Sequence, residues 1–258
     1  MDLTGRVAVV IGGTSGIGRT LAAGLAAAGA DVVPTGRREA MIEEVCAEIE
    51  SAGGKTMRQA CDIGSRESVD RFRDAVLARF SRVDVLLNAA GQTFRKPTAD
   101  VSEEQWNRIL DVNLTGMLRT CQSFYRPLAA SRRGRIVNIA SLTSFVAFYE
   151  VTAYAASKGA VLALTRNLAI EWARDGINVN AIAPGVVDTP MWDTVDSLFA
   201  KYENRPIGEK KKLVGLAVPF GRMGRPDDYR GPAVFLASSD SDYVVAQCLN
   251  VDGGNWMS

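Results

Sequence analysis

VAVVIGGTSGIG, at residues 7–18, is the most informative stretch of this chain. Its five apolar, mostly β-branched residues predict a buried strand, and Gly12, Gly16 and Gly18 follow where a helix is expected to begin. The first glycine would permit a tight turn, the second would let the backbone approach a pyrophosphate, and the third would let the helix pack on the strand. Free N–H groups at the helix N-terminus would then face the phosphates. The stretch therefore predicts a dinucleotide site formed by Gly12, Thr14, Ser15, Gly16, Ile17 and Gly18.

The same alternation of strand and helix continues along the chain, which is typical of βαβ units and a parallel sheet. Strands are expected at residues 7–11, 31–35, 56–61, 83–88, 135–140, 178–182 and 247–251. Helices are expected at residues 17–28, 39–52, 66–79, 103–130, 153–174 and 226–237. The strands are almost entirely apolar, as in a sheet covered on both faces. Because no linker or repeat divides the chain, we expect a single domain over residues 1–258.

One segment departs from this alternation. Residues 189–224 interrupt the last strand–helix unit and carry Lys210-Lys211-Lys212, Pro206 and Pro219. A long insertion at the carboxyl end of a strand is a natural cover for a ligand crevice. We therefore expect residues 189–224 to form a substrate lid, although a solvated surface excursion would have the same composition.

The bulk composition excludes several classes of function. The 258 residues include 30 basic and 29 acidic side chains, a balance with no long-range attraction to nucleic acid or to a membrane surface. There is no histidine, and the four cysteines are far apart, so no metal site is expected. Such cysteines are typical of reduced thiols in a cytoplasmic protein. The first residues resemble neither a signal peptide nor a membrane span.

The end of the second expected strand bears on the choice of cofactor. Sites for NAD usually place an acidic residue here to hold the ribose hydroxyls. This chain has Gly36 instead, followed by Arg37 and Arg38. A guanidinium can grip a 2′-phosphate with two hydrogen bonds. The expected cofactor is therefore NADP, with NAD as the alternative if the two arginines only decorate the start of a helix.

Tyr154 and Lys158 are one helical turn apart, so their side chains share a helix face. A phenol is a poor base at neutral pH because its ordinary pKa is about 10. A nearby ammonium favours the phenolate, so we expect Lys158 to lower the pKa of Tyr154. The pair would act as a general acid and base in a chain without histidine. Ser141 stands thirteen residues before Tyr154 and completes the candidate group.

Several motifs stand together in the order and spacing of the short-chain dehydrogenase/reductase family: the glycine loop, Asn88-Ala89-Ala90-Gly91, Asn113, Ser141, Tyr154, Lys158 and Pro184-Gly185. The chain resembles the compact branch of that family over essentially its whole length. The resemblance implies a doubly wound Rossmann fold with about seven parallel strands and helices on both faces. It also implies reversible hydride transfer between a nicotinamide and an alcohol or carbonyl.

The resemblance further implies a role for each matching residue. Asp62 and Ile63 would bracket the adenine, Asn88 would line the cofactor cleft, and Thr189 would hold the carboxamide end. The other residues implied to contact the cofactor are Ala89, Gly91, Tyr154, Lys158, Pro184, Gly185 and Val187.

In the catalytic group, Tyr154 would take the alcohol proton as a phenolate, and Lys158 would lower its pKa and hold the nicotinamide ribose. Ser141 would donate a hydrogen bond to the substrate oxygen, and Asn113 would order a water between Lys158 and solvent. Two positions depart from the family's habit: Ile11 replaces a threonine and Ala89 an asparagine. Because both help tie the glycine loop to the fourth strand, we expect packing to replace that tie.

The C-terminal part resembles bacterial polyol dehydrogenases of the sorbitol type, at residues 186–188, 192–193, 202–204, 208–211, 218–225 and 250–258. This implies a polyol and ketose pair as substrate and product. The residues expected to form the substrate pocket are Gln92, Phe94, Ser141, Thr143, Phe148, Glu150 and Trp192. A reductase of 3-oxoacyl groups or hydrophobic ketones is the alternative, and a non-catalytic dinucleotide sensor a remote one. The family's packing of long helices implies a homotetramer, with a dimer as fallback.

Overall fold

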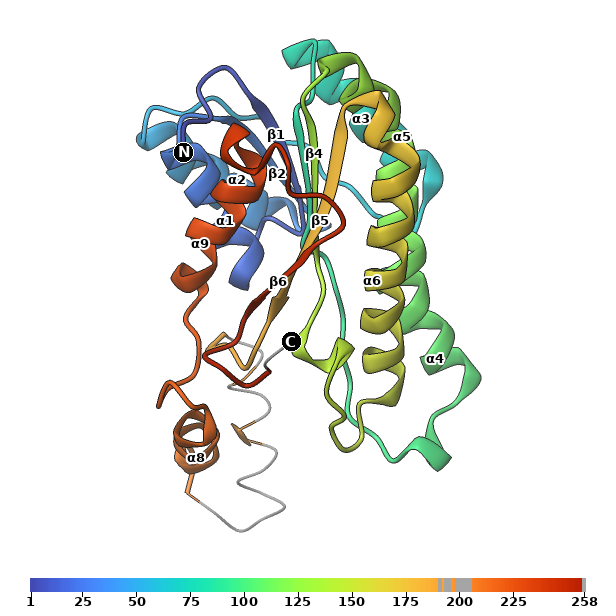
Figure 1. The fold of residues 1–258 in the computed structure, drawn as a ribbon, viewed down its shortest axis with the longest axis vertical. Helices are drawn as coiled ribbons and strands as arrows, with labels where there is room; N and C mark the ends of the chain where they lie inside the picture. Colours follow the sequence, from blue (N-terminus) through green and yellow to red (C-terminus); the bar gives the residue numbers. More distant parts are fainter. Residues whose placement is uncertain (190–191, 193–195, 198–205, 257–258) are drawn as a thin grey trace.

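A parallel sheet forms the middle layer of the protein (Figure 1). The computed structural model describes residues 1–189, 192, 196–197 and 206–256, and in these residues the sheet has six strands. Every neighbouring pair of strands is parallel. Because the strand order changes direction between β1 and β3, a crevice is expected at the carboxyl ends of these two strands. Across the sheet the strands are β2 (Asp31–Thr35), β1 (Val7–Ile11), β3 (Val85–Asn88), β4 (Gly134–Ile139), β5 (Ile177–Pro184) and β6 (Cys248–Val251).

Helices cover both faces of the sheet, as the apolar strands predicted (Figure 1). On one face lie α1 (Gly16–Ala27), α2 (Glu39–Ser51) and α9 (Arg230–Ala237). On the other lie α3 (Arg66–Phe80), α5 (Gly116–Ser131) and α6 (Thr152–Trp172). Successive residues of β1 serve the two faces in turn: Ala8 and Val10 join one apolar cluster, and Val9 and Ile11 join the other. The predicted α/β fold with a doubly covered parallel sheet is confirmed.

One expected strand is absent from the sheet, which therefore has six strands rather than about seven. Residues 56–61 lie beside β2, but the backbone hydrogen bonds to it are only near their ends, where Val32 N donates to Lys55 O and Cys61 N donates to Gly36 O, each at 2.9 Å. Between these two bonds the Thr35 side chain donates to Gln59 O at 2.7 Å. Val32 points its N–H toward this segment, and Pro34, two residues on, faces the same side. Because proline has no N–H, the ladder cannot continue there.

The long helix expected at residues 103–130 is three pieces. Ser102 caps α4 (Glu103–Leu110) with a capping box, a π-helical turn covers Asp111–Thr115, and α5 follows directly. A π-helical turn inserts one extra residue per turn, and such turns often mark functional sites. Here the turn carries Asn113, whose side chain is fully buried.

The segment expected to form a lid falls only partly within the described residues. Residues 190–191, 193–195 and 198–205 lie outside them. The described part contains α8 (Glu209–Ala217), whose Lys211 forms an ion pair with Asp188 at 2.6 Å. The buried carboxylate of Asp196 accepts hydrogen bonds from the N–H groups of Gly208 and Lys211 at the start of α8. Among the described residues, no helix combines the length and hydropathy needed to span a bilayer.

Candidate active site

The loop between β1 and α1 allows a close approach of a ligand to the backbone. Gly12 has a φ of 77° and Gly16 a φ of 51°, in the left-handed region that favours glycine. A Cβ on Gly18 would lie 2.1 Å from the Gly12 carbonyl oxygen, so any larger residue would push the loop from the helix. Ser15 is the N-cap of α1, but its side chain makes no capping hydrogen bond. The first N–H groups of α1 are therefore available to an anion.

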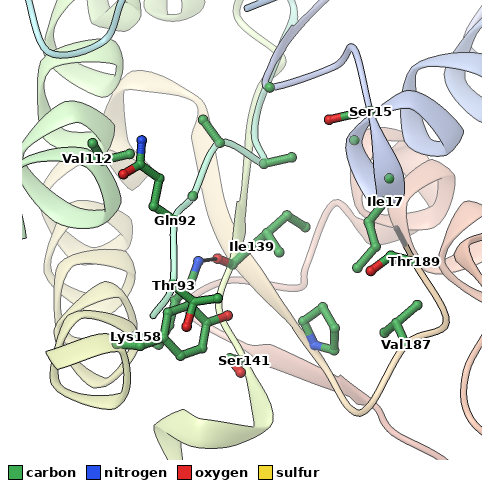
Figure 2. A pocket seen from close by; sticks show the side chains of 18 of the residues that line it. Ser15, Ile17, Gln92, Thr93, Val112, Ile139, Ser141, Lys158, Val187 and Thr189 are labelled. Atoms are coloured by element: carbon green, nitrogen blue, oxygen red, sulfur yellow. Dashed lines mark hydrogen bonds between the residues drawn. The ribbon is translucent and has the colours of Figure 1, made fainter. Parts of the chain in front are cut away.

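This loop opens onto a cleft of about 1010 Å³ at the carboxyl ends of the strands. Figure 2 shows Ser15, Ile17, Val187 and Thr189 on one side of the cleft and Ser141 and Lys158 on the other. The expected cofactor residues that line it are Gly12, Thr14, Ser15, Gly16, Ile17, Gly18, Arg37, Arg38, Asp62, Ile63, Ala89, Gly91, Tyr154, Lys158, Pro184, Gly185, Val187 and Thr189. The expected substrate residues that line it are Gln92, Ser141, Thr143, Phe148, Glu150 and Trp192. One cleft thus brings together nearly the whole predicted set.

The side chains at the end of β2 fit a phosphorylated ribose. Arg37 and Arg38 both line the cleft, and Arg38 Nη2 donates to Ser15 Oγ at 3.4 Å, beside the phosphate loop. A Cβ on Gly36 would lie 3.0 Å from Thr14 Oγ1, which leaves little room for an acidic side chain. Two guanidinium groups with no carboxylate at this position suit a 2′-phosphate better than free ribose hydroxyls.

Two expected lining residues are placed elsewhere. Asn88 is buried below the cleft, where its Nδ2 donates to Asn138 Oδ1 at 2.9 Å and its Oδ1 accepts from Thr120 Oγ1 at 2.8 Å. The expectation that Asn88 lines the cofactor cleft is therefore wrong; it ties β3 to β4 and α5. Phe94 is half-buried and is not among the lining residues. Its neighbours Thr93 and Arg95 line the cleft instead.

The glycine loop keeps its tie to β3 despite the unusual Ile11 and Ala89. Ala89 N donates to Ile11 O at 2.8 Å, and the Ile11 side chain is buried in the core. A backbone hydrogen bond and apolar packing therefore hold the start of the glycine loop against the end of β3.

Helix α6 presents Tyr154 and Lys158 to the cleft from successive turns, as their spacing predicted. Lys158 Nζ lies 5.8 Å from the centre of the Tyr154 ring and donates to Ile139 O at 2.6 Å. Ser141 follows β4 and is hydrogen-bonded to the Tyr154 phenol. It also caps a short 3-10 turn, where its Oγ accepts from Thr143 N at 3.2 Å. A hydroxyl, a phenol and an ammonium therefore converge on one wall of the cleft.

Burial dominates the electrostatics of this group. Burial raises the pKa of the Tyr154 phenol, and the hydrogen bond from Ser141 opposes that rise. In this structure burial therefore sets the direction of the shift, and the expected lowering of the Tyr154 pKa by Lys158 stays a prediction. Burial lowers the pKa of Lys158 to about 8, so its ammonium persists at neutral pH and is lost in mild alkali. At neutral pH the tyrosine is thus a protonated acid, the state required to protonate a substrate oxygen.

Asn113 does not line the cleft but fixes the elements that do. Its Nδ2 donates to Gln92 O at 2.9 Å and to Ser157 Oγ at 3.0 Å, and its Oδ1 accepts from Gln92 N at 2.8 Å. The π-helical turn therefore joins the loop after β3 to the helix that carries Tyr154. The proposed ordering of a water by Asn113 stays a prediction.

Sequence reasoning missed several lining residues, among them Thr93, Arg95, Tyr149 and Lys210. Thr93, Arg95 and Tyr149 are each one position from a residue that was predicted, whereas Lys210 lies on α8, 18 positions from Trp192. Irregular loops lack the periodicity that reveals which side chains share a face. Extending each predicted loop by one residue would have found Thr93, Arg95 and Tyr149, but it would not have reached Lys210.

The depressed pKa of Lys158 predicts a stability change with pH. The unfolded lysine titrates near 10.5, so between pH 8 and 10.5 the unfolded chain binds more protons and stability should rise with pH. Below about pH 8 the full cost of burying the ammonium is present. We expect Lys158→Met to have a higher free energy of unfolding than the parent. This excess should be largest below pH 8 and should decrease toward pH 10.5. Urea unfolding of both proteins at several pH values checks this, and a constant difference would contradict it.

Comparison with known proteins agrees with this geometry. Residues 6–198 match the sequence pattern of the family described as short chain dehydrogenase, and the chain belongs to that family. It is therefore a nicotinamide-dependent oxidoreductase acting on CH–OH groups of small molecules.

The names of individual relatives indicate which substrates similar proteins act on. The chain is 42% identical to a sorbitol dehydrogenase of Cereibacter sphaeroides and 40% identical to a galactitol 2-dehydrogenase of Agrobacterium fabrum, in each case over the full length of both proteins. It is also similar to the structure of a candidate NAD(P)-dependent gluconate 5-dehydrogenase from Beutenbergia cavernae with NADP bound at low occupancy. That structure is 43% identical, with a TM-score of 0.88 over 98% of this chain and 97% of the other.

Proposed function

We propose that this enzyme interconverts a sugar alcohol and its ketose with NADP as the cofactor. The observation that carries the proposal is the convergence of Ser141, Tyr154 and Lys158 in a cleft that begins at an uncapped helix N-terminus and two arginines. The full-length similarity to a sorbitol and a galactitol dehydrogenase supports a polyol as the substrate.

In this proposal Tyr154 is the proton carrier. During oxidation its phenolate takes the hydroxyl proton of the substrate while the hydride leaves the same carbon, and a carbonyl forms. During reduction the phenol returns the proton. Ser141 donates a hydrogen bond to the substrate oxygen, and the positive charge of Lys158 favours the phenolate. The cofactor, when bound, accepts or supplies the hydride at its nicotinamide ring.

An absorbance assay of nicotinamide reduction with a panel of polyols, run with NADP⁺ and NAD⁺ in parallel, tests the proposal. Turnover of a six-carbon polyol with NADP⁺ preferred would support both the substrate assignment and the cofactor assignment. Activity confined to hydrophobic ketones or 3-oxoacyl thioesters would overturn the polyol assignment and leave the dehydrogenase class intact.

Replacing Arg37 by alanine tests the cofactor assignment by binding alone. A guanidinium hydrogen-bonded to a phosphate contributes about 1.5–3 kcal/mol, so the affinity for NADPH should fall by roughly 10- to 100-fold. The affinity for NADH should change little, because NADH has no 2′-phosphate. Fluorescence titration of both nucleotides checks this, and Arg79→Ala, far from the cleft at the end of α3, is the matched control. Equal losses for the two nucleotides would count against an Arg37–phosphate contact.

Two further proposals concern larger-scale organisation. We propose that residues 189–224 act as a substrate lid, since Trp192, Lys210 and Val214 line the cleft.

We also propose that the protein is a homotetramer, which light scattering in solution would test.

A further inference from the structure

Two loops meet at the substrate end of the cleft through one backbone hydrogen bond and one hydrogen bond from a side chain to a backbone oxygen. Lys96 N donates to Glu150 O at 2.8 Å, and Arg95 Nη2 donates to Tyr149 O at 3.0 Å. Glu150 has a φ of 65°, in the left-handed region that side chains other than glycine and asparagine seldom adopt. Strained backbone of this kind persists where its surroundings over-determine it, commonly at functional sites. The loops therefore hold the Glu150 backbone in one place beside Arg95.

At this position the negative charge of Glu150 lies beside the positive charge of Arg95. The Arg95 guanidinium and the Glu150 carboxylate lie 4.0 Å apart, and both residues line the cleft. Their side chains are 33% and 49% exposed, so the pair is accessible to solvent and to a substrate that enters the cleft. Glu150 thus partly neutralises an arginine that could otherwise hold an anion.

The negative charge of Glu150 also distinguishes it from the other charged residues at the substrate end of the cleft. Among the described residues that line the cleft, the acidic ones are Asp62 and Glu150, and Asp62 lies at the end expected to hold adenine. The basic residues on the substrate side are Arg95, Lys158 and Lys210. Lys158 already donates to Ile139 O, and Lys210 lies on α8, on the lid side of the cleft. Glu150 is therefore the carboxylate, within this described set, that sets the charge met by the substrate.

We infer that Glu150 is a specificity determinant that admits neutral polyols and rejects sugar acids. A polyol hydroxyl can donate to the Glu150 carboxylate, whereas a substrate carboxylate would be repelled by it and would lose Arg95 as a partner. Without the Glu150 charge, Arg95 could bind a substrate carboxylate with two parallel hydrogen bonds. The inference rests on the proposed polyol activity. It bears on a real division among similar proteins, which include two polyol dehydrogenases and a candidate gluconate dehydrogenase.

The test compares kcat/KM for a six-carbon polyol and for the aldonate that carries a carboxylate in place of one terminal CH₂OH group. Glu150→Gln keeps the size and the backbone conformation and removes only the charge. Because the pair is partly exposed, we expect the ratio of aldonate to polyol kcat/KM to rise by about tenfold, the lower end for a charge-assisted hydrogen bond. The double variant Glu150→Gln/Arg95→Gln should lose that gain, since the gain requires the guanidinium.

Two controls separate the possible explanations. Glu150→Gly removes the charge and also relieves the left-handed strain, so the same ratio as Glu150→Gln would assign the effect to charge. The inhibition constant of the aldonate, measured against whichever alcohol is turned over, tests the inference even if no polyol is a substrate. Tighter inhibition in Glu150→Gln supports it. An unchanged ratio and inhibition constant in a folded Glu150→Gln protein, or a parent enzyme that prefers the aldonate, would overturn it.

Discussion

Tyr154→Phe is expected to lower kcat by about 10³-fold, within the range that general acid–base catalysis contributes. The substitution removes one oxygen from a ring that α6 positions in the cleft, so the cavity shape and the hydrogen bond from Lys158 to Ile139 O are kept. Nucleotide affinity should change by no more than a few-fold, because the ring remains. Steady-state rates in both directions and a fluorescence titration of NADPH measure the two effects.

Tyr243→Phe is the matched control for this prediction. Tyr243 is fully exposed and does not line the cleft. It loses the same oxygen, and kcat should stay within a factor of two. Near-normal turnover in the Tyr154 variant would show that another group moves the proton.

Gly12→Ala is expected to remove cofactor binding almost completely. A Cβ at this position would lie 2.5 Å from Ala90 N and 2.7 Å from Ala90 Cα, which are backbone atoms and cannot swing away. The φ of 77° adds a left-handed cost of about 1–2 kcal/mol. If the loop moves, two or three hydrogen bonds from N–H groups to phosphate are lost, each contributing about 1.5–3 kcal/mol. The affinity for NADPH should therefore fall by more than about 100-fold.

Gly231→Ala provides the control, because a Cβ at this exposed position in α9 meets nothing within 4 Å. Its stability should change by less than about 1 kcal/mol and its nucleotide affinity should not change. Nucleotide titration and thermal unfolding of both variants are the measurements. A Gly12→Ala protein that binds NADPH with parental affinity would refute the role given to this loop.

Residues with a strong periodic or motif signal were predicted well from the sequence. The alternation of β1 between two apolar clusters and the one-turn spacing of Tyr154 and Lys158 both follow from fixed geometry. Asn88 was misplaced although a signal existed: it shares a face of β3 with Leu86, which packs in the core beneath α5. Alternation along the strand therefore directs Asn88 toward Thr120 rather than toward the cleft.

Loop contacts could not be predicted in the same way. The pairing of Arg95 with Glu150 depends on how two irregular segments meet, and neither segment has a period. The direction of the Tyr154 pKa shift also required the fold, because burial raises this pKa and sequence spacing does not reveal the depth of burial.

Pro34 has a further consequence for how the protein behaves at high concentration. An exposed edge strand offers a row of unpaired N–H and C=O groups on which another chain can add a strand, a common start of aggregation. β2 stands at one edge of the sheet, but Pro34 lacks the donor and residues 55–61 lie along the outer side, bonded near both ends. Another chain therefore cannot add a strand at this edge. The segment that fails to form a seventh strand still covers the edge, so we expect little aggregation through β2.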